Sequence, residues 1–457
     1  MGRLFGTDGA RGIANTELTC ELSMGIGRAA AMVLTEHTNR KSKFLIGMDT
    51  RASSQMLEAS ISAGLCSVGA DVMLLGEIPT PAVAYLVRKY EYDAAIMISA
   101  SHNPCEYNGI KIFQGTGYKL PDALEEEIES IILDKSQVPS IKVGGEIGRI
   151  AYSQTAQTDY ISYLVDVAEE ELNKNGYENF NDLKIAVDCS NGSASVTAPQ
   201  IFMRLCDECY FIASHPNGTN INENCGSTHM SILQDFVVRN NCDIGLAFDG
   251  DADRFLAVDE NGEIVDGDKL IAIFAKYMKY NGTLRNNTAV VTVMSNMGFF
   301  KFCEENQINC QKTKVGDRYV LENMVENDYV IGGEQSGHII FKDYATTGDG
   351  QLSALKLLCI MKATGKKLSE LASVMQVFPQ TLINVRVSDF GKARFPHDEE
   401  IKNAIKEAEK ELGNSGRVLV RVSGTEPLVR IMLEGNDEKK INVLAQEIAQ
   451  VVKERLL

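Results

Sequence analysis

The 457-residue chain contains no tryptophan and no apolar run long enough to cross a membrane. Its first residues also lack the apolar core of a secretory signal peptide, so we expect neither export nor membrane insertion. Basic side chains are in the minority, because 45 Lys and Arg accompany 62 Asp and Glu and leave a net charge of −17. A protein with this charge repels phosphate backbones and anionic lipids, which argues against a nucleic-acid or membrane partner.

Signals for a disulfide framework or a zinc site are also missing. The 11 cysteines are an odd number scattered along a large chain, which is typical of reduced thiols in the cytoplasm. One C-x-x-C pair, Cys206 and Cys209, lacks a second pair or a histidine cluster, so we interpret it as structural. What the chain does contain is 44% hydrophobic residues, enough for the cores of several domains.

Helix-like and strand-like segments alternate through most of the chain. This alternation predicts βα units around mainly parallel sheets, with further rounds beginning near residues 183 and 289. From residue 382 the order becomes α+β, with two amphipathic helices on either side of a strand. The expected helices are 19–36, 53–69, 80–90, 397–412 and 437–455, and the expected strands include 43–47, 72–75, one ending at 98, 183–188, 289–293, 382–387 and 418–422.

The segment 96–104 changes abruptly from apolar to polar. Its apolar residues predict a buried strand, and Pro104 cannot continue a strand ladder because it has no N–H. Open α/β folds bind ligands in such loops at the ends of strands. Ser101 is therefore a candidate nucleophile with His102 as a neighbouring proton carrier, and a plain strand-to-loop turn is the alternative.

Three carboxylates at alternate positions, Asp249, Asp251 and Asp253, follow another strand-like run. Like charges this close repel one another unless a cation binds them, and oxygen ligands suit Mg²⁺ or Ca²⁺. An EF-hand is excluded because Arg254 occupies the position that needs glycine and because the flanking runs resemble strands. Three carboxylates leave coordination positions for a phosphate oxygen, which favours Mg²⁺; a solvated loop is the alternative.

Two further segments suit polar, phosphorylated ligands. One is glycine-rich and carries Glu334 and Ser336, which can hydrogen-bond to hydroxyl or amine groups. The other places a Ser-Gly-Thr turn between Arg421 and Arg430, whose guanidinium groups offer phosphate a bidentate fork. Taken alone, each segment is also typical of an ordinary turn between strands, the glycine-rich one more so.

Together the four segments resemble the α-D-phosphohexomutase family, and the resemblance covers essentially the whole chain, beginning at Leu4–Gly12. Ser101 falls at the phosphorylated position of the family's phosphoserine loop, and Asp249–Arg254 is similar to its metal loop. Gly333–His338 is similar to the sugar loop, and its Gln335 is the form typical of members that act on glucosamine phosphates.

The resemblance implies an α/β fold of four domains, namely three mixed α/β sheet domains with βα repeats and a C-terminal α+β domain, around a central active-site cleft. Asp49–Arg51 and Gly316–Tyr319 also resemble family segments, and they either brace the cleft or form helix caps and surface ion pairs. The expected domains are 1–152 with the phosphoserine loop, 153–256 with the metal loop, 257–373 with the sugar loop and 374–457 with the phosphate loop.

The resemblance also implies the roles of single residues. Ser101 would carry a phosphoryl group and, with the three aspartates, hold one Mg²⁺ per chain. Lys111 matches the family's general base or charge stabiliser, and to act as a base it needs a pKa lowered from about 10.4. The catalytic set is Ser101, His102, Lys111 and Arg11, the metal set is Asp249, Asp251, Asp253 and Ser101, and the substrate-binding set is Arg254, Glu334, Ser336, His338, Arg421, Ser423, Gly424, Thr425 and Arg430.

The implied activity is an isomerisation of a small hexosamine phosphate. Glucosamine 6-phosphate and glucosamine 1-phosphate interconvert through the phosphoserine and a 1,6-bisphosphate, which also serves as primer. The product would feed UDP-N-acetylglucosamine and cell-wall precursor synthesis in the cytoplasm, and a homodimer is the assembly to test. The first alternative is phosphomannomutase/phosphoglucomutase activity in the same family, and the second is a non-catalytic Ca²⁺ or sugar-phosphate binding protein on the same scaffold.

Overall fold

The computed structural model describes residues 4–6, 8–35, 40–423 and 427–456. The chain divides into two compact units, which we describe separately. The larger combines Met1–Met294 with Ile308–Val374, and the smaller combines Ser295–Gln307 with Met375–Leu457. Within the described ranges, each helix is too short or too polar to span a membrane.

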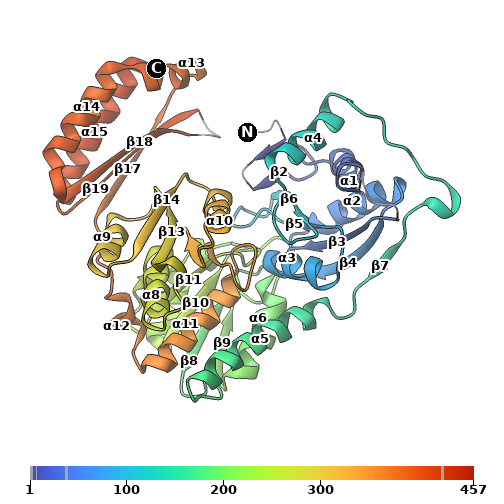
Figure 1. Cartoon of the computed structure of the whole chain (residues 1–457), viewed down its shortest axis with the longest axis horizontal. Coiled ribbons are helices and arrows are strands. Elements are labelled where there is room, and N and C mark those ends of the chain that lie inside the picture. The colour runs from blue at the N-terminus through green and yellow to red at the C-terminus, as the bar shows by residue number, and fades with distance from the viewer. Residues whose placement is uncertain (1–3, 7, 36–39, 424–426, 457) are drawn as a thin grey trace. The chain divides into compact units, whose positions relative to one another are not determined.

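The first sheet of the larger unit has seven strands in the order β1-β2-β6-β5-β3-β4-β7 (Figure 1). Strands β3, β4, β5 and β7 pair in parallel, as the alternation predicts, whereas β6, β2 and β1 pair antiparallel because the polar loop after β5 returns the chain directly to β6. Helices α2 and α3 pack on this sheet, and α1 packs on α2 and α4. These elements are β1 (Phe5–Gly6), β2 (Gly9–Ile13), α1 (Cys20–Thr35), β3 (Lys43–Met48), α2 (Ser54–Ser67), β4 (Asp71–Glu77), α3 (Thr80–Lys89), β5 (Ala94–Ile98), β6 (Tyr107–Gln114), α4 (Asp122–Leu133) and β7 (Ile150–Tyr152).

The second sheet has five strands in the order β12-β11-β10-β8-β9. Strands β10 and β11 form an antiparallel hairpin around the acidic loop, so strands flank that loop in place of EF-hand helices. The sheet continues through β11 and β12, beyond residue 256, and the domain boundaries themselves stay a prediction. These elements are α5 (Ala156–Lys174), β8 (Lys184–Asp188), α6 (Ala194–Leu205), β9 (Glu208–Ile212), α7 (Ser231–Asn240), β10 (Ile244–Phe248), β11 (Phe255–Asp259) and β12 (Ile264–Val265).

The third sheet has four strands in the order β14-β13-β15-β16. Helix α11 is buried along most of its length because it packs against α5, α8 and strands of both the second and the third sheets, which explains its apolar character on all sides. These elements are α8 (Gly267–Tyr280), β13 (Thr288–Thr292), β14 (Asn309–Thr313), α10 (Asp317–Glu326), β15 (Ile331–Gly333), β16 (Ile339–Phe341), α11 (Gly350–Thr364) and α12 (Leu368–Ala372).

The smaller unit has the predicted α+β order. Its three strands form an antiparallel sheet, β17-β19-β18, and the apolar faces of α14 and α15 cover the core that includes Val429, Ile431 and Leu433. These elements are α9 (Met297–Glu305), β17 (Gln380–Arg386), α13 (Asp389–Arg394), α14 (Glu399–Leu412), β18 (Gly416–Val422), β19 (Leu428–Gly435) and α15 (Glu438–Leu456).

Three polar loops of the larger unit each follow the end of a buried strand. The serine loop (residues 99–106) follows β5, the acidic loop (249–254) follows β10, and the glycine-rich loop (334–338) follows β15. The glycine-rich loop packs on β11, because the Phe255 N–H donates to the Gly337 carbonyl at 3.0 Å. The first and the last of these loops are more than two hundred residues apart in the sequence. All three belong to the larger unit, whose folding brings them into contact.

Candidate active site

Ser101 lies in a buried, left-handed turn next to the acidic loop. Its φ of 52° is a conformation that residues other than glycine rarely adopt. The Ser101 hydroxyl donates to Asp249 Oδ2 at 2.5 Å and lies 3.3 Å from His102 Nδ1. The structure therefore joins two loops that are 148 residues apart, and it places a nucleophile, a carboxylate and an imidazole within contact of one another.

The three aspartates of the acidic loop fit a divalent metal ion. One carboxylate oxygen from each of Asp249, Asp251 and Asp253 lies within 4.8 Å of the others, and all three side chains are buried. Asp251 Oδ1 and Asp253 Oδ1 have no hydrogen-bond partner among the described residues. Burial, followed by the charges of Asp253 and Asp251, raises the pKa of Asp249 well above its ordinary value. A hard cation with oxygen ligands, such as Mg²⁺, removes both the repulsion and the unpaired oxygens.

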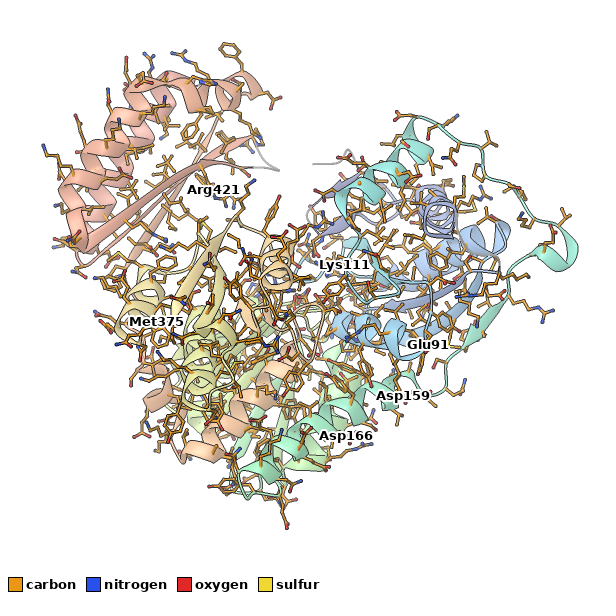
Figure 2. All side chains as sticks on the ribbon, viewed as in Figure 1. Glu91, Lys111, Asp159, Asp166, Met375 and Arg421 are labelled. Atoms are coloured by element: carbon orange, nitrogen blue, oxygen red, sulfur yellow. The ribbon has the colours of Figure 1, made fainter. Side chains whose placement is uncertain are left out.

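Lys111, labelled in Figure 2, extends from β6 into the same cluster and is 1% exposed. Its Nζ lies 2.8 Å from Asp251, 3.2 Å from Asp8 and 3.4 Å from Asp253. Burial alone would lower the pKa of Lys111, but these carboxylates outweigh burial and raise that pKa above its ordinary value. The lowered pKa that a general base needs is thus not found, and the surroundings favour a lysine that stays positively charged.

The two predicted cleft histidines occupy different environments. Burial, followed by the charges of Arg254 and Arg11, lowers the pKa of His102 to about 4, so this imidazole is neutral near pH 7 and can accept a proton. His338 Nε2 accepts the Gly348 N–H at 3.0 Å, and its Nδ1 lies 3.6 Å from Asp253. Because Nε2 accepts this hydrogen bond, it carries no proton in the neutral ring. The proton of neutral His338 therefore lies on Nδ1, which faces Asp253 of the acidic loop.

Two arginines, Arg254 at the end of the acidic loop and Arg11 on β2, have donor atoms available for an anion. Arg254 Nε is 4.0 Å from both Asp249 and Asp253, and Arg11 on β2 pairs with Asp8. The Nε atoms of Arg11 and Arg254 are buried and have no hydrogen-bond partner in the described parts of the chain. A buried guanidinium donor without a partner is well suited to a phosphoryl oxygen.

The glycine-rich loop holds one carboxylate inside and one hydroxyl outside. Glu334 Oε1 accepts the Gly316 N–H at 3.1 Å, and burial followed by the charge of Asp317 raises the Glu334 pKa. Ser336 is exposed. Gln335 instead donates to Asp266, the residue that caps α8, at 3.1 Å, so its side chain anchors the loop to that helix.

The smaller unit carries the arginine-bracketed turn. Arg421 on β18, labelled in Figure 2, is the direct cross-strand partner of Arg430 on β19. Burial, followed by the charge of Arg430, lowers the pKa of Arg421. Like charges on opposite strands are destabilising, and an anion between them relieves the repulsion. Ser423 closes the hairpin by donating its N–H to the Leu428 carbonyl at 2.8 Å, whereas Gly424 and Thr425 lie outside the described residues.

Some residues that contact the site were not predicted as site residues. Thr80 donates to Asp251 at 2.6 Å, and Lys119 pairs with both Asp8 and Asp317 at 2.6 Å. A proline on each side of Thr80 marks the start of a helix, but no local pattern indicates its partner far along the chain. Sequence patterns report neighbours in the chain, whereas these contacts join residues that are 111 or more positions apart.

The Asp49–Arg51 segment is a buried brace rather than a surface ion pair. The side chains of Asp49 and Arg51 are both fully buried, with Arg51 Nε 2.9 Å from Asp49 Oδ2. Both lie beneath the serine loop, because Ser99 donates to Asp49 at 2.6 Å and Arg51 donates to the Ser101 carbonyl at 2.9 Å.

Four family models match the chain in order. They are described as phosphoglucomutase/phosphomannomutase α/β/α domain I over residues 2–139, domain II over 158–262, domain III over 266–378, and the C-terminal domain over 382–451. Phosphoglucosamine mutases from Acetivibrio thermocellus and Caldicellulosiruptor saccharolyticus are each 54% identical to the chain, and in both comparisons the match covers 100% of each sequence.

Solved structures share the fold. A phosphoglucomutase/phosphomannomutase family protein from Burkholderia thailandensis matches with a TM-score of 0.78 at 22% identity, over 100% of this chain and 98% of that one. The N-acetylphosphoglucosamine mutase of Aspergillus fumigatus, solved with GlcNAc-6P and magnesium, matches with a TM-score of 0.67 at 15% identity, over 100% and 96% of the two chains. At these identities the likeness is one of architecture.

Proposed function

This chain belongs to the phosphoglucomutase/phosphomannomutase family, and we propose that it interconverts glucosamine 6-phosphate and glucosamine 1-phosphate. One observation carries the proposal: the Ser101 hydroxyl contacts Asp249 inside a buried acidic cluster, where a nucleophile and a metal site are needed together. The amino sugar is chosen over other hexoses because curated relatives 52–54% identical over their full length are phosphoglucosamine mutases.

Ser101 is the phosphoryl carrier in the proposed reaction. The 1-hydroxyl of glucosamine 6-phosphate attacks the phosphorus on Ser101, the bond to Ser101 Oγ breaks, and the hydroxyl proton passes to the departing Ser101 Oγ, so that glucosamine 1,6-bisphosphate and a free Ser101 hydroxyl form. The bisphosphate then reverses its orientation. Ser101 Oγ attacks the phosphorus of the 6-phosphate, the bond to the sugar 6-oxygen breaks, and the Ser101 proton passes to that oxygen, so that glucosamine 1-phosphate leaves a phosphorylated Ser101 behind. The same bisphosphate primes an enzyme that has lost its phosphate.

The cations around Ser101 stabilise the transferring group. Lys111, held as a cation by its carboxylate neighbours, and the unpartnered Nε atoms of Arg11 and Arg254 offset the charge that develops on the phosphoryl oxygens. The Ser101 hydroxyl proton is directed to Asp249 Oδ2. Neutral His102, whose Nδ1 lies 3.3 Å from Ser101 Oγ, is the proposed carrier that passes this proton to the departing sugar oxygen when Ser101 acts as nucleophile. Lys111 is assigned to charge stabilisation and His102 to proton transfer.

One Mg²⁺ would be held by Asp249, Asp251 and Asp253 together with an oxygen of the Ser101 phosphate. When bound it supplies Lewis-acid polarisation of the phosphoryl group. Without it, the three buried aspartates and the phosphoserine repel one another, so the protein residues alone give an electrostatically unfavourable site.

Substrate recognition is divided between two loops. Glu334 and Ser336 bind sugar hydroxyl or amino groups, His338 positions the sugar loop, and Gln335 shapes that loop through its hydrogen bond to Asp266. The phosphate that is not reacting binds the arginine-bracketed turn, whose proposed ligands are Arg421, Ser423, Gly424, Thr425 and Arg430. We place the reaction in the cytoplasm, where its product feeds UDP-N-acetylglucosamine and cell-wall precursor synthesis, and we propose a homodimer as the assembly.

The deciding experiment is kcat/KM for glucosamine 6-phosphate, glucose 6-phosphate and mannose 6-phosphate, each with Mg²⁺ and trace bisphosphate. We expect a large preference for the amino sugar. Comparable rates on mannose or glucose phosphates would keep the serine mechanism but assign the chain to phosphomannomutase/phosphoglucomutase activity. Absence of turnover on all three, in protein whose Ser101 has been phosphorylated, would overturn the enzyme proposal and leave a binding protein.

A further inference from the structure

The buried guanidinium group of Arg51 donates several hydrogen bonds to backbone carbonyls in and next to the serine loop. Its guanidinium donates to the carbonyl oxygens of Ser101 at 2.9 Å, Asn103 at 2.8 Å and Tyr107 at 3.0 Å, and also to that of Pro104. One buried side chain therefore binds three carbonyls of the loop that carries the nucleophile and the first carbonyl of β6. An arginine fork is suited to this task because its donors are rigid and planar.

Asn222, from the segment that precedes α7, binds two of the same carbonyls. Its amide donates to the Ser101 carbonyl at 2.9 Å and to the Asn103 carbonyl at 3.0 Å. These two carbonyls thus each accept one bond from Arg51, on the first sheet's side, and one from Asn222, on the second sheet's side. The double contact links the serine loop to the region that also supplies the acidic loop.

Asp49 holds Arg51 and the loop in one network. Asp49 accepts the Arg51 Nε at 2.9 Å and the Ser99 hydroxyl at 2.6 Å, and Ser99 Oγ in turn accepts the Ser101 N–H at 3.0 Å. Gly250 completes the packing, since a Cβ at Gly250 would lie 2.5 Å from the Ser101 carbonyl oxygen. The backbone of Ser101 is therefore fixed by hydrogen bonds at both its N–H and its C=O.

A left-handed, non-glycine residue needs such support. The conformation of Ser101 is unfavourable for a residue with a Cβ, and it persists only where surrounding contacts determine it. The direction of Ser101 Oγ follows from that backbone conformation. A rotation of the peptide would move the hydroxyl, or the phosphate it carries, away from Asp249.

We infer that Arg51 and Asn222 are positioning residues that clamp the phosphoserine loop, fixing Ser101 Oγ at the acidic cluster for both phosphoryl transfers. The inference rests on the proposed function. Both residues act on backbone carbonyls of the loop. Loosening the clamp therefore slows phosphoryl transfer, while the affinity for sugar phosphate, which other loops provide, changes little.

The test compares native protein with Arg51→Lys and with Asn222→Gly, because Asn222 has a left-handed φ of 58° that glycine adopts without strain. The matched controls are Arg28→Lys and Asn220→Gly. Arg28 Nε donates to Ser67 in the same sheet domain, and Asn220, two residues before Asn222, donates its amide to the His215 carbonyl. Each protein is loaded with phosphate from glucose 1,6-bisphosphate, and intact mass reports the loading. Single-turnover transfer to glucosamine 6-phosphate is then measured, with steady-state kcat and KM and the hydrogen exchange of peptides covering 99–107.

We expect the transfer rate of both clamp variants to fall by roughly tenfold or more, with KM within about twofold of native. Hydrogen exchange should quicken in 99–107, where the Ser101 and Asn103 amides are hydrogen-bonded, and not in distant peptides. The two controls should match the native protein in both measurements.

Unchanged exchange at 99–107 in Asn222→Gly would overturn the clamp, and so would faster exchange with an unchanged transfer rate. Asn222→Gly carries the test even where Arg51→Lys fails to fold, because Asn222 belongs to a loop rather than to a buried ion pair and glycine suits its left-handed backbone. Failure of native protein to accept phosphate or turn over would count against the proposed function instead, and the exchange comparison would still decide whether the loop is clamped.

Discussion

Thr80 and Asp251 are joined by two hydrogen bonds, although 171 residues separate them. The Thr80 N–H donates to the Asp251 carbonyl at 2.9 Å, and its hydroxyl donates to Oδ2 at 2.6 Å. Lys111 donates to the same oxygen at 2.8 Å. The other carboxylate oxygen, Oδ1, is buried without a hydrogen bond to any described residue, so the start of α3 determines which oxygen stays available to a cation.

Replacing Thr80 with valine keeps its shape and removes the hydroxyl. We expect the Mg²⁺ concentration for half-maximal activity to rise by about tenfold, because the partners of metal ligands orient them. Thr197→Val is the matched control, since Thr197 bonds Gln351 in a buried pair outside the acidic cluster and its loss should lower only the melting temperature. An unchanged Mg²⁺ requirement in Thr80→Val would contradict the role assigned to Thr80.

Removal of the metal should abolish turnover. EDTA-treated protein is expected to be inactive and to recover with added Mg²⁺, because the three buried aspartates otherwise repel the phosphorylated serine. Asp251→Asn should lower both the rate and the metal affinity. An unaltered native rate in excess EDTA would show that the acidic loop serves another purpose.

Ser101→Ala should eliminate the phosphoserine relay and leave the fold intact, because Ser101 lies in a loop beyond β5. Intact-mass analysis of native protein should show molecules with one extra phosphoryl group, and this species should be missing from the variant. Retention of more than about one per cent of native activity by Ser101→Ala would be incompatible with a covalent intermediate on this side chain.

Asp349 should make stability depend on pH. It is buried at the start of α11, and Tyr160 donates to it at 2.9 Å. Burial raises the Asp349 pKa from 3.8 to about 6, so its protonated form is favoured in the folded state. Asp349 therefore stabilises the folded state fully below about pH 4, where it is protonated in both the folded and the unfolded chain. This stabilisation, about 3 kcal/mol, is lost as the pH rises from about 4 through about 6, because the unfolded chain then releases the proton more easily.

Asp349→Asn tests this sign directly. The amide keeps an acceptor for the Leu352 N–H and can donate to Tyr160, yet it does not titrate. Between pH 4 and pH 7.5 the melting temperature of native protein should fall relative to that of the variant. A constant difference between the two proteins across this range would show that the Asp349 pKa is ordinary.

Gly267 leaves room for the glycine-rich loop (334–338), which we propose binds the sugar. A Cβ at this position would lie 2.1 Å from the Glu334 carbonyl oxygen, so Gly267→Ala must displace the loop. We expect KM for the sugar phosphate to rise more than kcat falls, by several-fold. Gly145→Ala is the control because a Cβ there meets nothing within 4 Å, and kinetics that match between the two variants would argue against the sugar-loop assignment.

Several features were predictable because they depend on neighbours in the chain. The apolar run before Ser101 predicted β5, and its polar continuation predicted a loop, since buried strands do not tolerate a cluster of polar groups. The strands that flank the acidic loop, and the change to α+β order after residue 382, follow from the same local patterns. Alternate carboxylates in one short loop indicated a cation by their spacing alone.

Tertiary structure decided the rest, because it depends on distances between residues that the chain keeps far apart. The pKa of Lys111 is raised rather than lowered because Asp8, Asp251 and Asp253 come from other loops, and charge interactions follow separation in space. Arg51 is a brace rather than a surface residue only because the serine loop folds over it. Local sequence patterns specify the chemical groups and the strand ends that present them, whereas packing between sheets sets their partners and hence their charge and orientation.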